Sequence, residues 1–212
     1  MEAQNDSHFW NRAAGNRRFT HPLDRERLTR LLPRDAVILD YGCGQGRLSG
    51  ELVGLGYVNV LGIDSSHEMI RVAREEVPDA GFVEIDGATL PCGDASIDAV
   101  LLFAVLTCIP ADDAQKNLLR EFKRILKPGG LLLISDYPLQ TDTRNRERYE
   151  EFEEALGHGR FRLPEGVVLR HHAREWFDGL LAGFRVDEAL EFDWTTMNGN
   201  PARIIQFWAH KE

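Results

Sequence analysis

Val-Ile-Leu-Asp-Tyr-Gly-Cys-Gly-Gln-Gly, residues 37–46, carries more structural information than any other segment of this chain. Its apolar run ends at Asp40 and predicts a buried parallel strand. Three glycines follow at alternate positions, Gly42, Gly44 and Gly46. They let the backbone turn sharply and approach a ligand, and the first N–H groups of an expected helix over 47–55 are free to meet a polar group. Alone, the turn fits a dinucleotide site, an adenosyl-cofactor site or a tight packing contact.

Two further apolar runs also end in an acidic residue. The run over 58–63 is followed by Asp64 and Ser65, and the run over 81–85 by Asp86-Gly87-Ala88. An acid at the end of the second strand can accept hydrogen bonds from ribose hydroxyls. Ligands of open parallel sheets bind at the carboxyl ends of the strands, so all three acids are expected to ring one crevice. A helix-cap or turn role explains any one of them but fits three poorly.

Five segments in this order resemble motifs of the class I S-adenosylmethionine-dependent methyltransferases, over about residues 35–136. Residues 37–46 look like the first motif and 61–70, Leu-Gly-Ile-Asp-Ser-Ser-His-Glu-Met-Ile, like the second. Residues 86–91 resemble the adenine-edge motif, 96–106 the fourth strand and its exit, and 124–134 the junction of a helix with the fifth strand. Five ordered motifs are far more specific than one glycine turn.

The resemblance implies S-adenosylmethionine as cofactor, with Asp64 on the ribose and Met69 near the adenine. The cofactor-binding residues that it implies are Trp10, Asp40, Tyr41, Gly42, Cys43, Gly44, Gly46, Asp64, Ser65, Met69, Asp86, Gly87, Ala88, Phe103 and Leu106. Two positions depart from the family pattern. Gln45 stands where the family often has an acid, and Cys108 where many members have histidine. Neither position therefore supplies a catalytic role by analogy.

Two other functions compete with a methyltransferase. An NAD-dependent oxidoreductase with a Rossmann fold usually shows Gly-x-Gly-x-x-Gly, whereas Gly46 comes one residue early. A catalytically inactive protein that binds the cofactor and a partner is the second alternative. The intact glycines and strand-end acids argue against it.

The composition indicates a single domain over residues 1–212, since 43% of the residues are hydrophobic. The net charge of −9 and the lack of a Lys/Arg-dense block argue against nucleic-acid and anionic-membrane partners. The polar N-terminus is not a secretory signal, and no apolar run is long enough to cross a bilayer. Three cysteines without metal-ligand spacing indicate free thiols, a cytoplasmic location and no metal site. We expect a monomer or homodimer.

Alternating patterns predict a doubly wound, Rossmann-like α/β fold with seven strands, mostly parallel, the seventh strand being antiparallel by family resemblance. Strands are expected over 37–39, 58–63, 82–85, 97–103, 131–136, 184–194 and 203–210. Helices are expected over 8–18, 23–32, 47–55, 68–76, 112–126, 141–154 and 173–181, with an irregular loop over 157–166.

Two segments outside the core are candidates for closing the site. The first is an N-terminal helical cap over about 1–33 that carries Phe9 and Trp10, and the second is an insert over about 138–170. Long connections in compact domains often act as lids, and aromatic residues would keep water from the reactive sulfonium. A solvated helix with paired charges is the alternative for the insert.

Methyl transfer depends mainly on placing the nucleophile, which can supply roughly 7–11 kcal/mol. A general base is needed only if the acceptor must lose a proton. The candidates are His171 and His172, which precede the helix expected over 173–181, and Tyr137 after the fifth strand. Helix capping and a wall position are the alternative roles. The segment 103–107 lacks a Pro-Pro-aromatic signature for nucleic-acid bases, so we expect a small-molecule acceptor with an O, N or S nucleophile.

Overall fold

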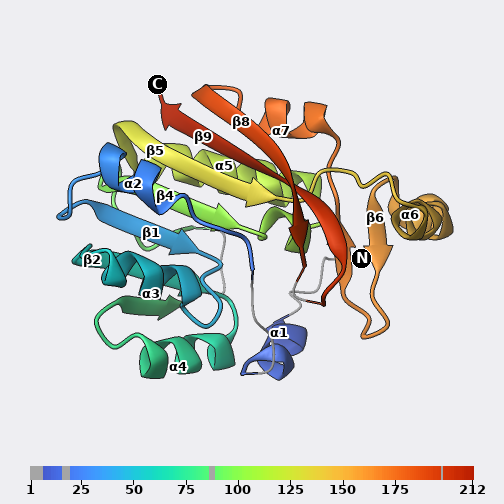
Figure 1. Cartoon of the computed structure of the whole chain (residues 1–212), viewed down its shortest axis with the longest axis horizontal. Coiled ribbons are helices and arrows are strands. Elements are labelled where there is room, and N and C mark those ends of the chain that lie inside the picture. Colours follow the sequence, from blue (N-terminus) through green and yellow to red (C-terminus); the bar gives the residue numbers. More distant parts are fainter. Residues whose placement is uncertain (1–6, 16–19, 86–88, 197) are drawn as a thin grey trace.

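The computed structural model describes residues 7–15, 20–85, 89–196 and 198–212, and is drawn in Figure 1. Its main strands are β1 (Val37–Tyr41), β2 (Asn59–Asp64), β3 (Gly81–Glu84), β4 (Ile97–Phe103), β5 (Leu126–Asp136), β8 (Phe184–Thr195) and β9 (Pro201–Lys211). They form one seven-stranded sheet in the order β3-β2-β1-β4-β5-β9-β8. The first five strands pair in parallel, and β9 runs antiparallel to both neighbours. The predicted fold class is confirmed.

Helices cover both faces of this sheet. The helices on the two faces are α2 (Arg25–Leu31), α3 (Arg47–Gly54), α4 (His67–Glu76), α5 (Asp112–Ile125) and α7 (Arg174–Leu180). Helix α1 (Ser7–Ala13) packs on α4, α6 (Thr143–Leu156) packs on β6, and a 3₁₀ turn, η1, lies at Leu106–Cys108. One core holds buried side chains of α2 and α3 against the sheet, and a second core holds those of α5 and α7. In α5 the apolar positions Leu118, Phe122 and Ile125 recur with helical spacing and bury that face.

Most observed boundaries lie within two residues of the predicted ones, and two differ by more. The helix expected over 8–18 ends at Ala13, and part of its expected length lies outside the described residues. Strand β5 begins five residues earlier than expected, at Leu126. Ile97 pairs with Leu126 but Ala99 pairs with Leu131, so the intervening Lys-Pro-Gly-Gly forms an irregularity in the ladder.

The insert between β5 and α7 is more regular than the sequence indicated. The expectation of an irregular loop over 157–166 is wrong in part, because β6 (Arg160–Arg162) and β7 (Val168–Arg170) form an antiparallel pair. Phe161 of β6 is buried, and this burial stabilises the short pair. Figure 1 shows α6 and β6 at the end of the sheet toward which β5 points. The insert therefore stands beside the carboxyl ends of the parallel strands.

Within the described residues, no helix has both the length and the apolar composition that crossing a membrane requires.

Candidate active site

The glycine turn after β1 has a backbone that only glycine adopts easily. Gly42, Gly44 and Gly46 have φ angles of +70°, +53° and +79°. A Cβ atom on Gly42 would lie 2.4 Å from a methyl carbon of Val105. The N–H groups of Gly42 and Cys43 both donate to the carbonyl of Ile63, at 2.7 and 3.0 Å. The turn is thus tied to the end of β2, where Asp64 follows.

Asp64 holds two loops at the edge of the sheet. Its carboxylate accepts a hydrogen bond from the Gly44 N–H at 2.9 Å and one from the Ser66 N–H at 2.9 Å. Burial raises the pKa of Asp64, and the backbone donors partly offset that rise. The carboxylate therefore shapes the glycine turn as well as lining the cavity beside it.

Asp40 serves the start of α3. It is buried and accepts hydrogen bonds from the Ser49 N–H at 3.1 Å and the Ser49 hydroxyl at 2.8 Å. Burial raises the pKa of Asp40 to about 6. Two of the three acids expected at one crevice, Asp40 and Asp64, line the same cavity. The third, Asp86, lies outside the described residues, as do Gly87 and Ala88.

A cavity of about 270 Å³ opens above the glycine turn. Ten of the predicted cofactor residues line it: Trp10, Asp40, Tyr41, Gly42, Cys43, Gly44, Asp64, Ser65, Met69 and Phe103. Gly46 and Leu106 were predicted but are not among its described walls. Leu106 is fully buried in the core, and a Cβ atom on Gly46 would lie 3.0 Å from the Phe82 ring, which indicates a packing role.

A second cavity of about 130 Å³ adjoins the first. Five of the described residues line both cavities: Trp10, Arg47, Phe103, Ala104 and Cys108. The remaining walls come mainly from the end of β5, from the insert and from the turn between β8 and β9. Tyr137 and His171 line this second cavity, whereas His172 is not among the described walls of either one.

Tyr137 lies between two histidine rings. It stacks on His171 with ring centroids 5.3 Å apart and meets the edge of His21 at 4.8 Å. Burial and the nearby Asp136 raise the pKa of Tyr137, so its hydroxyl stays protonated. Within the described part of the chain this hydroxyl has no hydrogen-bond partner, so it is available to a ligand.

The hydrogen bonds around His171 favour one tautomer of its ring. The Tyr149 hydroxyl accepts from the Gln140 N–H and lies 2.5 Å from Nδ1 of His171, so its own proton is free to be donated to that nitrogen. The remaining proton of the neutral ring then sits on Nε2. Burial and the charge of Arg148 lower the pKa of His171 to about 3. His171 is among the described walls of the second cavity, and in this tautomer its Nε2 atom is a hydrogen-bond donor.

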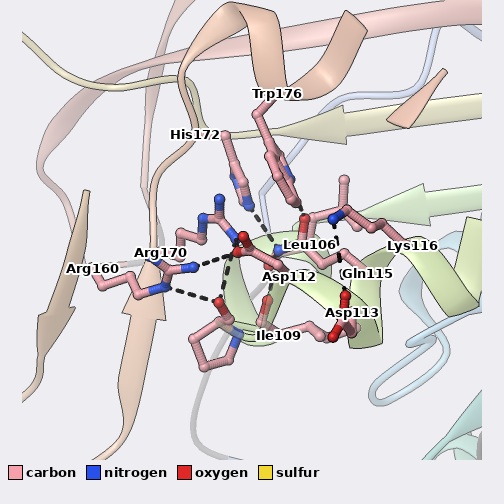
Figure 2. Close-up of polar contacts among 11 residues, drawn as sticks. Leu106, Ile109, Asp112, Asp113, Gln115, Lys116, Arg160, Arg170, His172 and Trp176 are labelled. Atoms are coloured by element: carbon pink, nitrogen blue, oxygen red, sulfur yellow. Dashed lines mark hydrogen bonds and ion pairs between the residues drawn. The ribbon is translucent and has the colours of Figure 1, made fainter. Parts of the chain in front are cut away.

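His172 joins the insert to α5, as Figure 2 shows. Its Nε2 atom accepts a hydrogen bond of 2.8 Å from the side-chain amide of Gln115, and Trp176 donates to the same amide at 2.7 Å. Asp112 accepts from Arg170 at 2.6 Å and also from Arg160. Burial lowers the pKa of His172 to about 3. The environment of His172 is therefore that of a structural residue.

One wall residue of the second cavity, His21, was not among the residues predicted from the sequence. Its Nδ1 atom lies 2.9 Å from the hydroxyl of Ser135, which also accepts from Gln206. Burial lowers the pKa of His21 to about 4. Ser135 lies 114 residues along the chain and Gln206 farther still, so no local pattern could have identified this site. Arg144 and Arg148 line the same cavity, and their i,i+4 spacing was a signal that they share a face.

The chain is similar to known methyltransferases in both sequence and structure. Residues 39–134 match the family model described as a methyltransferase domain. A crystal structure of an S-adenosylmethionine-dependent methyltransferase from Methanosarcina mazei has a TM-score of 0.83 at 27% identity, covering 92% of this chain and 99% of that chain.

Two curated relatives extend the comparison. The O-methyltransferase resE of Aspergillus sclerotiorum is 31% identical over 183 residues, which cover 82% of this chain and 62% of that protein. A tRNA (carboxymethyluridine(34)-5-O)-methyltransferase of Arabidopsis thaliana is 32% identical over 104 residues, which cover 49% of this chain and 24% of that protein. The chain spans about half the length of several curated relatives that it matches.

Proposed function

Because this chain belongs to the class I S-adenosylmethionine-dependent methyltransferases, we propose that it transfers a methyl group to a small molecule. The observation that carries the proposal is the pair of adjoining cavities with five shared wall residues among those described. We assign the cavity above the glycine turn to the cofactor and the cavity under the insert to the acceptor. The reacting atoms then meet at the shared wall.

The residues of the first cavity suit S-adenosylmethionine. Gly42 and Gly44 line this cavity at positive φ angles, so their backbone, which carries no Cβ atom, can lie close to a ligand. Asp64 stands at the end of β2, where family resemblance puts the ribose hydroxyls. Once bound, the cofactor supplies an activated methyl group on its sulfonium.

The chain's own contribution is placement and exclusion of water. Trp10 and Phe103 stand in both walls and present aromatic surface at the junction of the cavities. We propose that Tyr137 and His171 orient the acceptor as hydrogen-bond donors, since both line the second cavity and a neutral tyrosine and a neutral histidine each carry one donor. Holding the bound acceptor in line with the methyl group supplies most of the rate enhancement that the protein must provide. His172 contributes indirectly, because its hydrogen bond with Gln115 holds the insert against α5.

The acceptor class is also part of the proposal. The resE relative is an O-methyltransferase, which favours an oxygen nucleophile, and N and S nucleophiles remain in the proposal. A second cavity of about 130 Å³ suits a small molecule better than a nucleic acid.

The three cysteines are free thiols, which supports a reducing, cytoplasmic location. A monomer or homodimer stays our prediction.

Calorimetric titration with the demethylated cofactor and with NAD tests the cofactor assignment. We expect binding of the former only, and the reverse result would favour the oxidoreductase alternative. Incubation with radiolabelled S-adenosylmethionine and pools of small phenols, amines and thiols then tests transfer. Label on a bulk tRNA substrate and on none of the pools would contradict the small-molecule acceptor. Cofactor binding with no transfer to any substrate would favour the inactive binding protein.

A further inference from the structure

The second cavity has an unusual balance of charge for a chain with net charge −9. Three arginines are among its described walls, Arg47, Arg144 and Arg148, and no aspartate or glutamate is among them. The first cavity differs, because Asp40 and Asp64 accompany Arg47 there. The two cavities therefore suit ligand groups of different charge.

The three arginines are not equally available. Arg47 is paired with Glu51 at 2.7 Å and also donates to the His21 carbonyl. Arg144 is exposed, and its Nε atom lies 3.9 Å from Oδ1 of Asp142. Arg148 is half-buried, and within the described residues no carboxylate lies at ion-pair distance from it. A partly desolvated cation without a matching anion is costly, so a bound anion would relieve that cost.

The surroundings of Arg148 keep its guanidinium in place. Its central carbon lies 4.2 Å from the centre of the Phe161 ring, and Phe161 is itself buried in the insert. Tyr137 and His171 line the same cavity, and the Tyr137 hydroxyl and, in the tautomer that Tyr149 favours, Nε2 of His171 are hydrogen-bond donors. A guanidinium fork with two neutral donors matches the oxygen atoms of a carboxylate.

We propose that the methyl acceptor is an organic acid, whose carboxylate is bound by Arg148 with support from Arg144. The inference rests on the proposed function and names the substrate class of that site. A carboxylate fits better than a phosphate dianion, because the described walls hold only one half-buried guanidinium without a carboxylate partner. The apolar walls at Phe103 and Leu169 suit the hydrocarbon part of such an acid.

The test measures binding, so it does not depend on turnover. Protein saturated with the demethylated cofactor is titrated with benzoate, phenylacetate, 3-phenylpropionate and hexanoate, each against its primary amide, and with phenyl phosphate. We expect at least one acid to bind about 10-fold or more tightly than its amide, a difference of about 1.4 kcal/mol. All acids binding within twofold of their amides, or none detectably, would overturn the inference. Phenyl phosphate binding more tightly than every carboxylate would overturn it as well.

Variants assign the selectivity to its residue. Arg148→Gln should reduce the preference for acid over amide to twofold or less. Arg146→Gln, an exposed arginine on the same helix and outside the described walls, should keep the full preference. Arg144→Gln should lose part of the preference for acid over amide. Because Arg144 is exposed, this variant should fold and keeps the test valid if the Arg148 variant does not. A preference that survives both the Arg148 and the Arg144 changes would refute the assignment. Cofactor affinity, measured in the same samples, reports separately on the proposed function.

Discussion

At the scale of single residues, Asp64 joins cofactor recognition to the shape of the glycine turn. Its two hydrogen bonds from the Gly44 and Ser66 N–H groups connect the ends of β1 and β2. The sequence predicted Asp64 as a ligand of the ribose. Its second task, bracing the turn, depends on the proximity of the two strand ends.

Asp64→Ala should weaken binding of the demethylated cofactor by roughly 2–4 kcal/mol, since charge-assisted hydrogen bonds and the bracing of Gly44 are both lost. Calorimetric titration measures the change. Glu84→Ala is the matched control, because Glu84 ends the neighbouring strand β3 and pairs at the surface with His67. Native affinity in a folded Asp64→Ala protein would remove this residue from the site.

Gly42→Ala should lower the free energy of unfolding by about 2–4 kcal/mol, because of the strained positive φ and the contact with Val105. Gly54→Ala is the control. Gly54 lies in α3, and among the described residues a Cβ atom there would meet no atom within 4 Å beyond its own helical turn and chain neighbours. Gly54→Ala should therefore raise the free energy of unfolding by up to about 1 kcal/mol. Urea unfolding compares the two. A Gly42 variant as stable as the parent chain would mean that the turn is not constrained there.

The three histidines show which parts of the site a sequence can predict. His171 and His172 are neighbours in the chain, yet one lines the second cavity and the other bonds to Gln115 of α5. Adjacent residues in an extended segment point to opposite sides, so their different surroundings depend on what packs against each side. His21 is held at the cavity by Ser135, which the pairing of β5 with β9 brings beside Gln206, and by Arg47 of α3, all distant from it in the chain. The cofactor side was predictable because it is built from strand ends and a glycine turn.

At the scale of elements, the insert is a fixed wall where it meets α5. Asp112, at the first turn of α5, accepts from Arg160 of β6 and Arg170 of β7. Arg170 also lies over the Trp176 ring at 4.3 Å. No sequence pattern indicated this contact, because an irregular loop was expected in place of the β6–β7 pair.

Asp112→Ala should loosen the insert while leaving the cofactor cavity intact. We expect faster hydrogen exchange in β6, β7 and α6, and a loss of roughly 1–3 kcal/mol of stability, because Arg170 is left buried without its carboxylate. Affinity for the demethylated cofactor should stay within about twofold. Asp113→Ala is the control, since Asp113 is exposed and meets Lys116 at 3.9 Å. Unchanged exchange in the Asp112 variant would mean that other contacts hold the insert.

At the scale of the whole molecule, buried groups with opposite effects set the pH dependence of stability. Burial raises the pKa of Asp136 from near 3.8 to about 7, so its contribution to stability falls as pH rises from 3.8 to 7. His21, His171 and His172 have pKa values lowered from 6.5 to about 4, 3 and 3. They stay neutral in the fold and take up protons when unfolded, so their contribution falls as pH drops below 6.5.

Asp136→Asn should therefore steepen the loss of stability on acidification, by up to about 2 kcal/mol between about pH 7 and pH 5, since the opposing effect of the acid is gone. Urea unfolding at several pH values measures the slope. Asp35→Asn, at an exposed position, should follow the parent profile. A profile for Asp136→Asn parallel to that of the parent would mean that this carboxyl titrates normally in the fold.

The last prediction concerns closure of the two cavities. From the sequence, both the Phe9-Trp10 segment and the insert are candidates for closing the site, and we predict that such a segment becomes more ordered when ligands bind. The structure gives the two segments different attachments. The insert is tied to α5 through Asp112 and Gln115, whereas α1 contacts α4, where Asn11 accepts from the Ser66 hydroxyl. Trp10 lines both cavities, so its ring gains apolar contacts when they are filled. Hydrogen exchange with and without the demethylated cofactor should show a larger gain of protection in α1 than in α6. Equal protection of α1 in both states would make it a fixed wall, and acceptor selection would then rest on a cavity formed in advance.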